Sequence, residues 1–136
     1  MRALGSIAFG LMIIVAVSAT AAPLDGSVPM LCAIETVMAC NDPTICVRGT
    51  AATVNFPPTL KVDVGGRLVS GAATGRTAKI TSVGHGGGRL LVSGEEMGIA
   101  GIAWNVVIVE ASGAMSGAVL GHGGGFLMFG ACTPGS

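Results

Sequence analysis

The two histidines of the chain lie in nearly identical glycine-rich segments and are the first candidates for chemistry. His85 lies in VGHGGGRLLV and His122 in LGHGGGFLMF. Imidazole is a common metal ligand, so His85 and His122 could bind one metal ion together. The carboxylates that could complete such a site are Asp63, Glu95 and Glu96. The simpler interpretation is two loops between strands, in which glycine supplies positive φ and histidine tolerates it.

Two catalytic interpretations of the same segments lack the motifs that they require. A His-Gly-Gly-Gly oxyanion hole belongs with a Gly-x-Ser-x-Gly nucleophile segment, which is absent from this sequence. The phosphate-binding motif Gly-x-x-x-x-Gly-Lys-Ser/Thr is absent as well. Glu95 and Glu96 are adjacent, so on a strand they point to opposite faces and cannot act as one acid and base pair. We therefore assign no catalytic residue and do not expect an enzyme or a resident cofactor.

The amino-terminal segment has the organisation of a secretory signal peptide, predicted over residues 1–21. Arg2 supplies the positive charge, residues 7–17 form an apolar run, and Ala19-Thr20-Ala21 is a small-x-small cleavage site. An uncleaved membrane anchor is the alternative, but the apolar run is shorter than the roughly 20 residues that span a bilayer. We therefore predict a secreted or periplasmic protein whose single mature domain covers residues 22–136.

The four cysteines are then expected to form disulfides. They follow the pattern Cys-x7-Cys-x5-Cys, with Cys132 far downstream, and they include no Cys-x-x-Cys motif. An even number of cysteines in an oxidising compartment favours structural disulfides over metal binding or redox chemistry.

The pairing of the cysteines depends on the segment that carries the first two. Residues 29–40 are predicted to form a helix, because apolar residues recur there at helical spacing. In a helix, Cys32 and Cys40 would be about 12 Å apart, which is too far for a disulfide. Two pairings remain: Cys40 with Cys46 and Cys32 with Cys132, or Cys32 with Cys46 and Cys40 with Cys132. We favour the first, because Asn41-Asp42-Pro43 would turn the chain back toward the helix end.

Downstream of the predicted helix, short apolar runs separated by glycine and serine predict an antiparallel meander. The alternation is clearest where Leu60, Val62 and Val64 are interleaved with two charged residues, as in a half-buried strand. The runs cover residues 44–56, 60–64, 67–71, 77–83, 89–96, 99–110, 114–120 and 126–132. Gly65-Gly66 and Ser112-Gly113 are good hairpin turns. The fold class is therefore mainly β, a small antiparallel barrel or sandwich of about seven to eight strands preceded by one short helix.

Trp104 is the strongest single candidate for a core or pocket residue. It shares one strand face with Ile102, Val106 and Ile108. The sequence does not decide between an interior filled by side chains and one that leaves a ligand cavity.

Composition makes nucleic acid an unfavourable partner. Without Arg2, the mature domain has one more acidic than basic residue, and the chain has no tyrosine. Such a surface offers little to phosphate backbones or stacked bases. No membrane span is expected after signal cleavage.

The closing stretch WNVVIVEASGAMSGAVLGHGGGFLMFGAC resembles the end of small exported bacterial proteins that have no assigned activity. The resemblance covers about the last quarter of the chain and the Cys-x7-Cys-x5-Cys opening. It implies export and a link between early and late cysteines, and it carries no functional residues with it.

We expect an exported, non-catalytic binding or structural module whose partner is an unknown protein or small molecule. One alternative is a metal-binding protein that uses His85 and His122. Another is a carrier of a small apolar ligand in a barrel interior, with Trp104 in the pocket.

Overall fold

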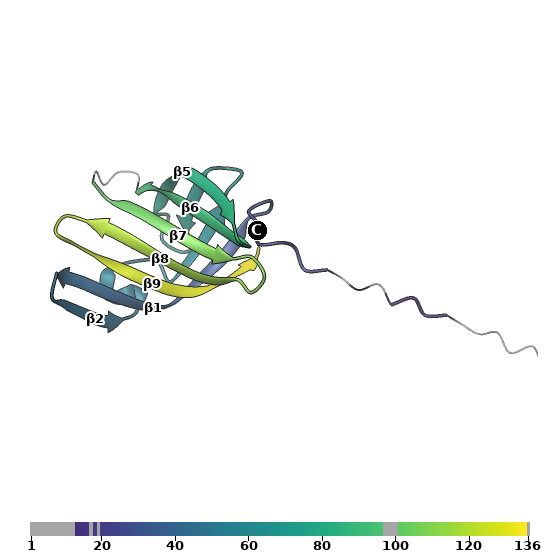
Figure 1. Cartoon of the computed structure of the whole chain (residues 1–136), viewed down its shortest axis with the longest axis horizontal. Helices are drawn as coiled ribbons and strands as arrows, with labels where there is room; N and C mark the ends of the chain where they lie inside the picture. The colour runs from purple at the N-terminus through teal and green to yellow at the C-terminus, as the bar shows by residue number, and fades with distance from the viewer. Residues whose placement is uncertain (1–12, 17, 19, 97–100, 136) are drawn as a thin grey trace, which may run out of the picture.

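The chain folds into a closed antiparallel barrel of eight strands with a ninth strand attached (Figure 1). The computed structural model describes residues 13–16, 18, 20–96 and 101–135. The elements are β1 (Met30–Asp42), β2 (Ile45–Gly49), the 3-10 helix η1 (Ala51–Val54), β3 (Thr59–Asp63), β4 (Leu68–Gly71), β5 (Thr77–Gly86), β6 (Arg89–Glu96), β7 (Ala103–Val109), β8 (Ala114–Gly121) and β9 (Gly124–Pro134). The sheet runs β2-β1-β3-β4-β5-β6-β7-β8-β9, and pairing of β1 with β9 closes the barrel. The predicted mainly-β class is confirmed, and the architecture is a barrel.

The predicted helix over residues 29–40 is wrong, because this segment forms most of strand β1. Met30 and Cys32 are buried on one face of the strand, as period-two alternation requires. Register then shifts between Ile34 and Thr36 against β9, so Glu35 is the extra residue of a β-bulge. The bulge moves the buried face from even to odd positions, and Val37 is the next fully buried residue. A strand with this bulge therefore has an apolar spacing that resembles a helical repeat.

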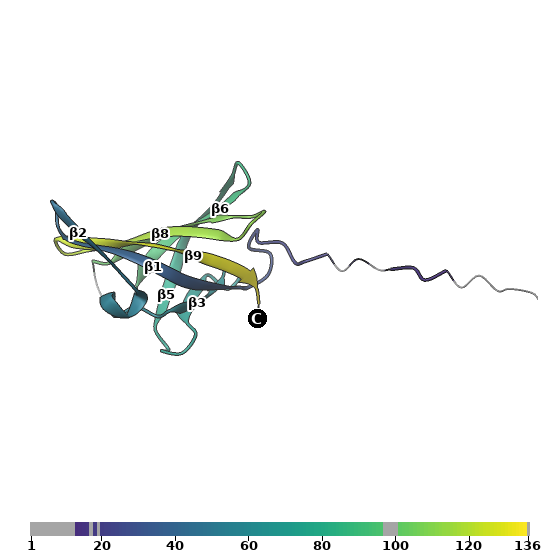
Figure 2. The same ribbon diagram turned by 90° about the horizontal axis from the view of Figure 1, so that it is seen from below.

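Strand β1 organises the barrel, because it pairs with three other strands. One edge pairs with β9 from Met30 to Cys40. The other edge pairs first with β3, over Met30 to Ala33, and then with β2, from Val37 onward. Figure 2 shows β8, β9 and β1 together in one layer, with β3 and β5 beneath them.

Both disulfides join residues that lie directly opposite each other on neighbouring strands. Cys32 bonds to Cys132 across the β1–β9 pair, and their Cα atoms are 3.9 Å apart. Cys40 bonds to Cys46 across the β1–β2 hairpin. This is the pairing that we favoured from the sequence, but the reason differs, since strand register and not a helix end brings the sulfurs together.

The remaining strands follow the predicted runs closely, with one departure. The run over residues 44–56 is a strand only in β2 and then turns into the 3-10 helix η1, which ends at Asn55 in the left-handed conformation (φ 50°). The β3–β4 and β7–β8 hairpins turn at the predicted glycines, and Gly113 has a φ of 76° that favours glycine. Part of the run over residues 99–110 lies outside the described residues.

The barrel interior is packed at one end. Met30, Leu90 and Ile108 are completely buried near the β5–β6 and β7–β8 turns. Leu24, from the segment before β1, belongs to the same cluster and lies close to Gly113. No charged or polar residue of the described chain is buried in this core. The opposite end of the interior, toward the β6–β7 and β8–β9 turns, holds the cavity described below.

Candidate functional site

The two histidines lie at opposite ends of the barrel. His85 is near the β5–β6 turn, where its Nδ1 is 3.4 Å from Oε1 of Glu110 in the β7–β8 turn. His122 lies in the β8–β9 turn, next to Gly101 of the β6–β7 connection. In an antiparallel meander these turns alternate between ends, and a strand of eight residues separates them by roughly 25 Å. One metal ion cannot contact both imidazoles within a single copy of the chain.

The carboxylates suggested for a metal site also lie apart. The Asp63 carboxylate accepts a hydrogen bond from the backbone N–H of Gly66 in the β3–β4 turn, at 2.8 Å. Glu95 is exposed on the outside of β6, whereas Glu96 pairs with Arg76. In the described part of the chain, no three His, Cys, Asp or Glu side chains form a group that could hold a metal ion.

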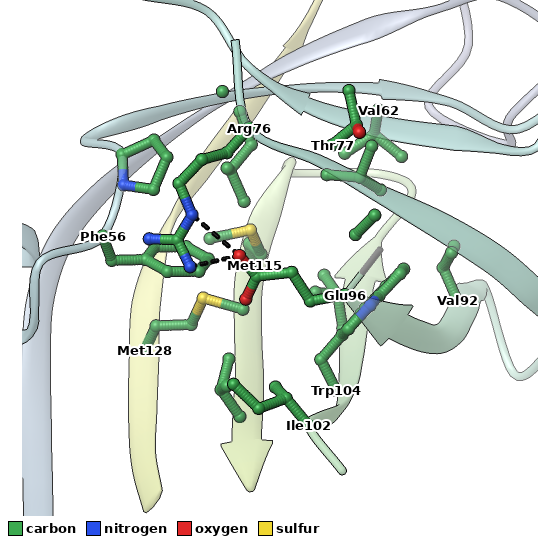
Figure 3. A pocket seen from close by; sticks show the side chains of 17 residues that line it. Phe56, Val62, Arg76, Thr77, Val92, Glu96, Ile102, Trp104, Met115 and Met128 are labelled. Carbon is green, nitrogen blue, oxygen red and sulfur yellow. Dashed lines mark hydrogen bonds and ion pairs between the residues drawn. The ribbon is translucent and has the colours of Figure 1, made fainter. Parts of the chain in front are cut away.

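The main candidate site is an apolar cavity of about 50 Å³ inside the barrel (Figure 3). All barrel strands other than β1 contribute lining residues. The lining residues share an inward orientation and, with few exceptions, an apolar side chain; they include Leu60, Val62, Val69, Ala78, Val92, Trp104, Val106, Met115, Val119 and Met128. An eight-stranded barrel has an interior that side chains can just fill or that can hold one small ligand. Here side chains fill one end and leave the other hollow.

Trp104 lies in the wall of this cavity and carries an unusual polar group. The residue is only 9% exposed. Its indole Nε1–H is buried and has no hydrogen-bond partner within the described ranges. A buried donor without a partner costs about 1–3 kcal/mol. The Trp104 indole therefore carries an unsatisfied donor that protein atoms cover almost completely.

The Trp104 indole packs against β6 at Gly94, which has no side chain to block it. Trp104 and Gly94 are cross-strand partners, and a Cβ atom at Gly94 would lie 2.9 Å from indole Cζ2. Because Cζ2 and Nε1 flank the same ring carbon, this edge of the indole sits where a larger residue would project. Glycine at position 94 thus leaves the space in which the ring packs against the strand.

An ion pair marks the outer end of the cavity, which we call the mouth, formed by Phe56, Arg76, Glu96 and Ile102. The Arg76 guanidinium donates to Oε1 of Glu96 through Nε, at 2.8 Å, and through Nη2. It also donates to the Asn55 carbonyl at 2.6 Å and lies 5.7 Å from the centroid of the Phe56 ring. Figure 3 shows Arg76 and Glu96 joined next to Phe56. The pair links the segment after η1, the start of β5 and the end of β6.

A second hollow, of about 390 Å³, lies outside the barrel between the β1–β2 and β8–β9 turns. Its lining includes three consecutive glycines and the exposed residues Leu120 and Leu127. Asp42 is the charged residue in its lining, and Asp42 already accepts hydrogen bonds from Thr44, which lower the pKa of its carboxyl. The hollow is larger than the interior cavity, but it offers fewer groups that could orient a ligand.

Sequence reasoning identified Trp104 but missed the mouth. Arg76 and Glu96 are 20 positions apart, and the pairing of β5 with β6 brings them together. Phe56 is the last residue of the predicted run over residues 44–56, and nothing in that run marks it as part of a site. The one available signal was Glu96, a charged residue at the end of the apolar run over residues 89–96. Charged residues at that position are also typical of solvent-exposed strand ends.

No protein-family model matches the chain, and no curated protein or solved structure shows significant similarity to it. Among the residues that the structure describes, no helix is long and apolar enough to cross a membrane. The candidate site must therefore be interpreted from its own geometry.

Proposed function

We propose that this protein is an exported, non-catalytic carrier that binds a small apolar molecule inside its barrel. The strongest support is the apolar cavity inside the barrel, whose wall includes Trp104. Small-molecule sites are mostly apolar and contain a few polar groups that fix orientation. The largely apolar lining, with Arg76 and Glu96 as its charged residues, fits that description.

Export is supported by two features. The two disulfides are of the kind that persists in oxidising compartments. In the predicted signal peptide, Ile13, Ile14 and Val15 are at least 76% exposed and are not packed in the core. Removal of such a segment leaves the barrel interior intact, and the mature protein would be secreted or periplasmic.

Trp104 is the single tryptophan of the chain, so its fluorescence reports on the cavity alone. The test is a titration of the disulfide-intact protein with a panel of small apolar compounds of different shape. We expect saturable quenching or a spectral shift with at least one compound. An unchanged spectrum across the whole panel would contradict the proposal.

Replacement of two alanines by leucine, one inside the barrel and one outside it, separates binding in the interior from binding on the surface. Ala78 lines the cavity, whereas Ala114 is exposed on β8. We expect Ala78→Leu to abolish the fluorescence response, since the larger side chain occupies the cavity, at a stability cost of about 1–3 kcal/mol. Ala114→Leu should leave the response unchanged. Thermal melts of both variants establish that each remains folded.

A further inference from the structure

Strand β2 leaves one edge of the sheet open. It pairs with β1 on one side, and no described strand pairs with its other side (Figure 1). An unpaired edge strand presents a row of backbone N–H and C=O groups with which another strand can pair. We propose that two copies of the chain associate through this edge, with the two β2 strands antiparallel to each other about a two-fold axis at Val47.

The distance between β1 and β2 shows which backbone groups of β2 are free. Cys40 and Cys46 are cross-strand partners, and their Cα atoms are 4.2 Å apart. This separation is typical of a non-hydrogen-bonded pair, at about 4.5 Å, and not of a hydrogen-bonded pair, at about 5.5 Å. The N–H and C=O groups of Cys46, and those of Arg48 two residues further on, therefore point toward the open edge. No turn or loop of the described chain forms a backbone hydrogen bond with these groups.

The register about Val47 pairs the whole strand. Val47 is the central residue of β2, so a two-fold axis at this position brings all five residues of one copy opposite those of the other. Cys46 of one copy then lies opposite Arg48 of the second copy, and each such pair can exchange two backbone hydrogen bonds. An axis at Arg48 would instead place two positive charges directly opposite each other, which is destabilising.

The apolar side chains of β2 become covered in this arrangement. Ile45 and Val47 are 61% and 63% exposed, and they lie on the same face of the strand. In the pair, the two Val47 side chains face each other on the axis, and Ile45 of each copy lies opposite Gly49 of the other. Because glycine has no side chain, Ile45 can approach Val47 of the second copy diagonally. The four exposed apolar side chains thus form one cluster.

The charges of the two hairpins are complementary. The diagonal neighbour of Arg48 in the second copy is Thr44, about 7–8 Å away and within reach of a long side chain. Thr44 donates hydrogen bonds to the Asp42 carboxylate, and they lower the pKa of this group, so it stays ionised. Arg48 and Asp42 have no ion-pair partner in the part of the chain that the structure describes. Each Arg48 can therefore pair with Asp42 of the second copy.

The contact is small, since five paired residues extend only about 17 Å. Stable interfaces bury about 1,200–2,000 Å² in total, and contacts below this range are weak and transient. We therefore expect a concentration-dependent dimer with a Kd on the order of 100 μM.

Analytical ultracentrifugation of the disulfide-intact protein, up to about 1 mM, tests the dimer. We expect the dimer fraction of the native protein to rise with concentration. Val47→Lys and Val47→Glu should each weaken association at least about tenfold, because like charges meet on the axis. An equimolar mixture of these two variants should associate again, since lysine then lies opposite glutamate. Thermal melts establish that both variants remain folded, as expected for an exposed position.

Leu91→Lys is the matched control, because Leu91 is an apolar residue of β6 that is 44% exposed and lies away from the open edge. This variant should dimerise as the native protein does. A native protein that stays monomeric at about 1 mM would overturn the proposal and leave the edge to an extended segment of another protein. Dimerisation that survives Val47→Lys, or that Leu91→Lys abolishes, would place the contact elsewhere. If the mixed variants stay monomeric, the register about Val47 is wrong.

Discussion

At the scale of single residues, glycines set how closely the strands approach one another near the site. Gly94 lies opposite the bulge between Ile80 and Ser82, and Gly130 lies opposite the bulge at Glu35. A Cβ atom at either glycine would overlap the carbonyl oxygen of the strand across from it. At each bulge the two backbones therefore approach too closely for any larger residue.

Gly94→Ala should destabilise the protein and disturb the site together. The added methyl group overlaps the Lys79 carbonyl oxygen and the indole of Trp104, so we expect a loss of about 1–3 kcal/mol in the free energy of unfolding. The tryptophan emission of the folded variant should also shift. Urea denaturation and emission spectra measure both effects.

Gly86→Ala is the matched control. Gly86 also lies in β5–β6, its φ is not positive, and no heavy atom of the described neighbours lies within 4 Å of the added methyl group. Its effect should stay within about 0.5 kcal/mol. Equal effects of the two substitutions would show that the close approach at Gly94 does not constrain the fold.

Residue patterns predicted the inward face of β7 but not the contacts around the cavity. Trp104, Val106 and Ile108 are buried on one face, as the alternation indicated, and Asn105 is exposed. The unpartnered Nε1–H could not be predicted, because it depends on which groups the other strands bring to the indole.

At the scale of elements, β1 shows where a periodic pattern is ambiguous. A single extra residue in a strand shifts its buried face by one position, and the resulting spacing imitates part of a helical repeat. The downstream strands lack such ambiguity where charged residues mark the outward positions, as in β3. The sequence therefore predicted the later strands well and assigned the first one wrongly.

The two disulfides should contribute unequally to stability, because they close loops of very different length. Cys32–Cys132 spans 100 positions and joins the strands that close the barrel, whereas Cys40–Cys46 spans 6 and holds only the β1–β2 hairpin. In the chain-entropy model, their loss costs about 5 and about 2 kcal/mol, respectively. Urea denaturation of the two double-alanine variants measures the difference.

The hairpin variant, Cys40→Ala with Cys46→Ala, serves as the control for loss of a disulfide in general. It should keep the barrel intact, since β2 lies outside the closed ring of strands. If this variant lost as much stability as Cys32→Ala with Cys132→Ala, closure of the barrel would not depend on the long-range bond.

At the scale of the whole molecule, the barrel has one filled end and one hollow end. Leu24 and the fully buried residues near the β7–β8 turn fill the first. The cavity and its mouth occupy the second, where Arg76 and Glu96 join segments that are distant in the sequence. The sequence predicted a barrel or sandwich, but the choice depends on the pairing of β1 with β9, which is a long-range property of register.

The central claim is that the hollow end of the barrel binds a small apolar molecule. A crystal structure of the disulfide-intact protein soaked with the compound that gives the strongest Trp104 fluorescence response tests it most directly. We predict electron density for one molecule inside the barrel, in contact with Trp104, Met115 and Met128. An interior that stays empty of ligand, or that is filled by rearranged side chains, would contradict the claim even if the compound were bound on the outer surface.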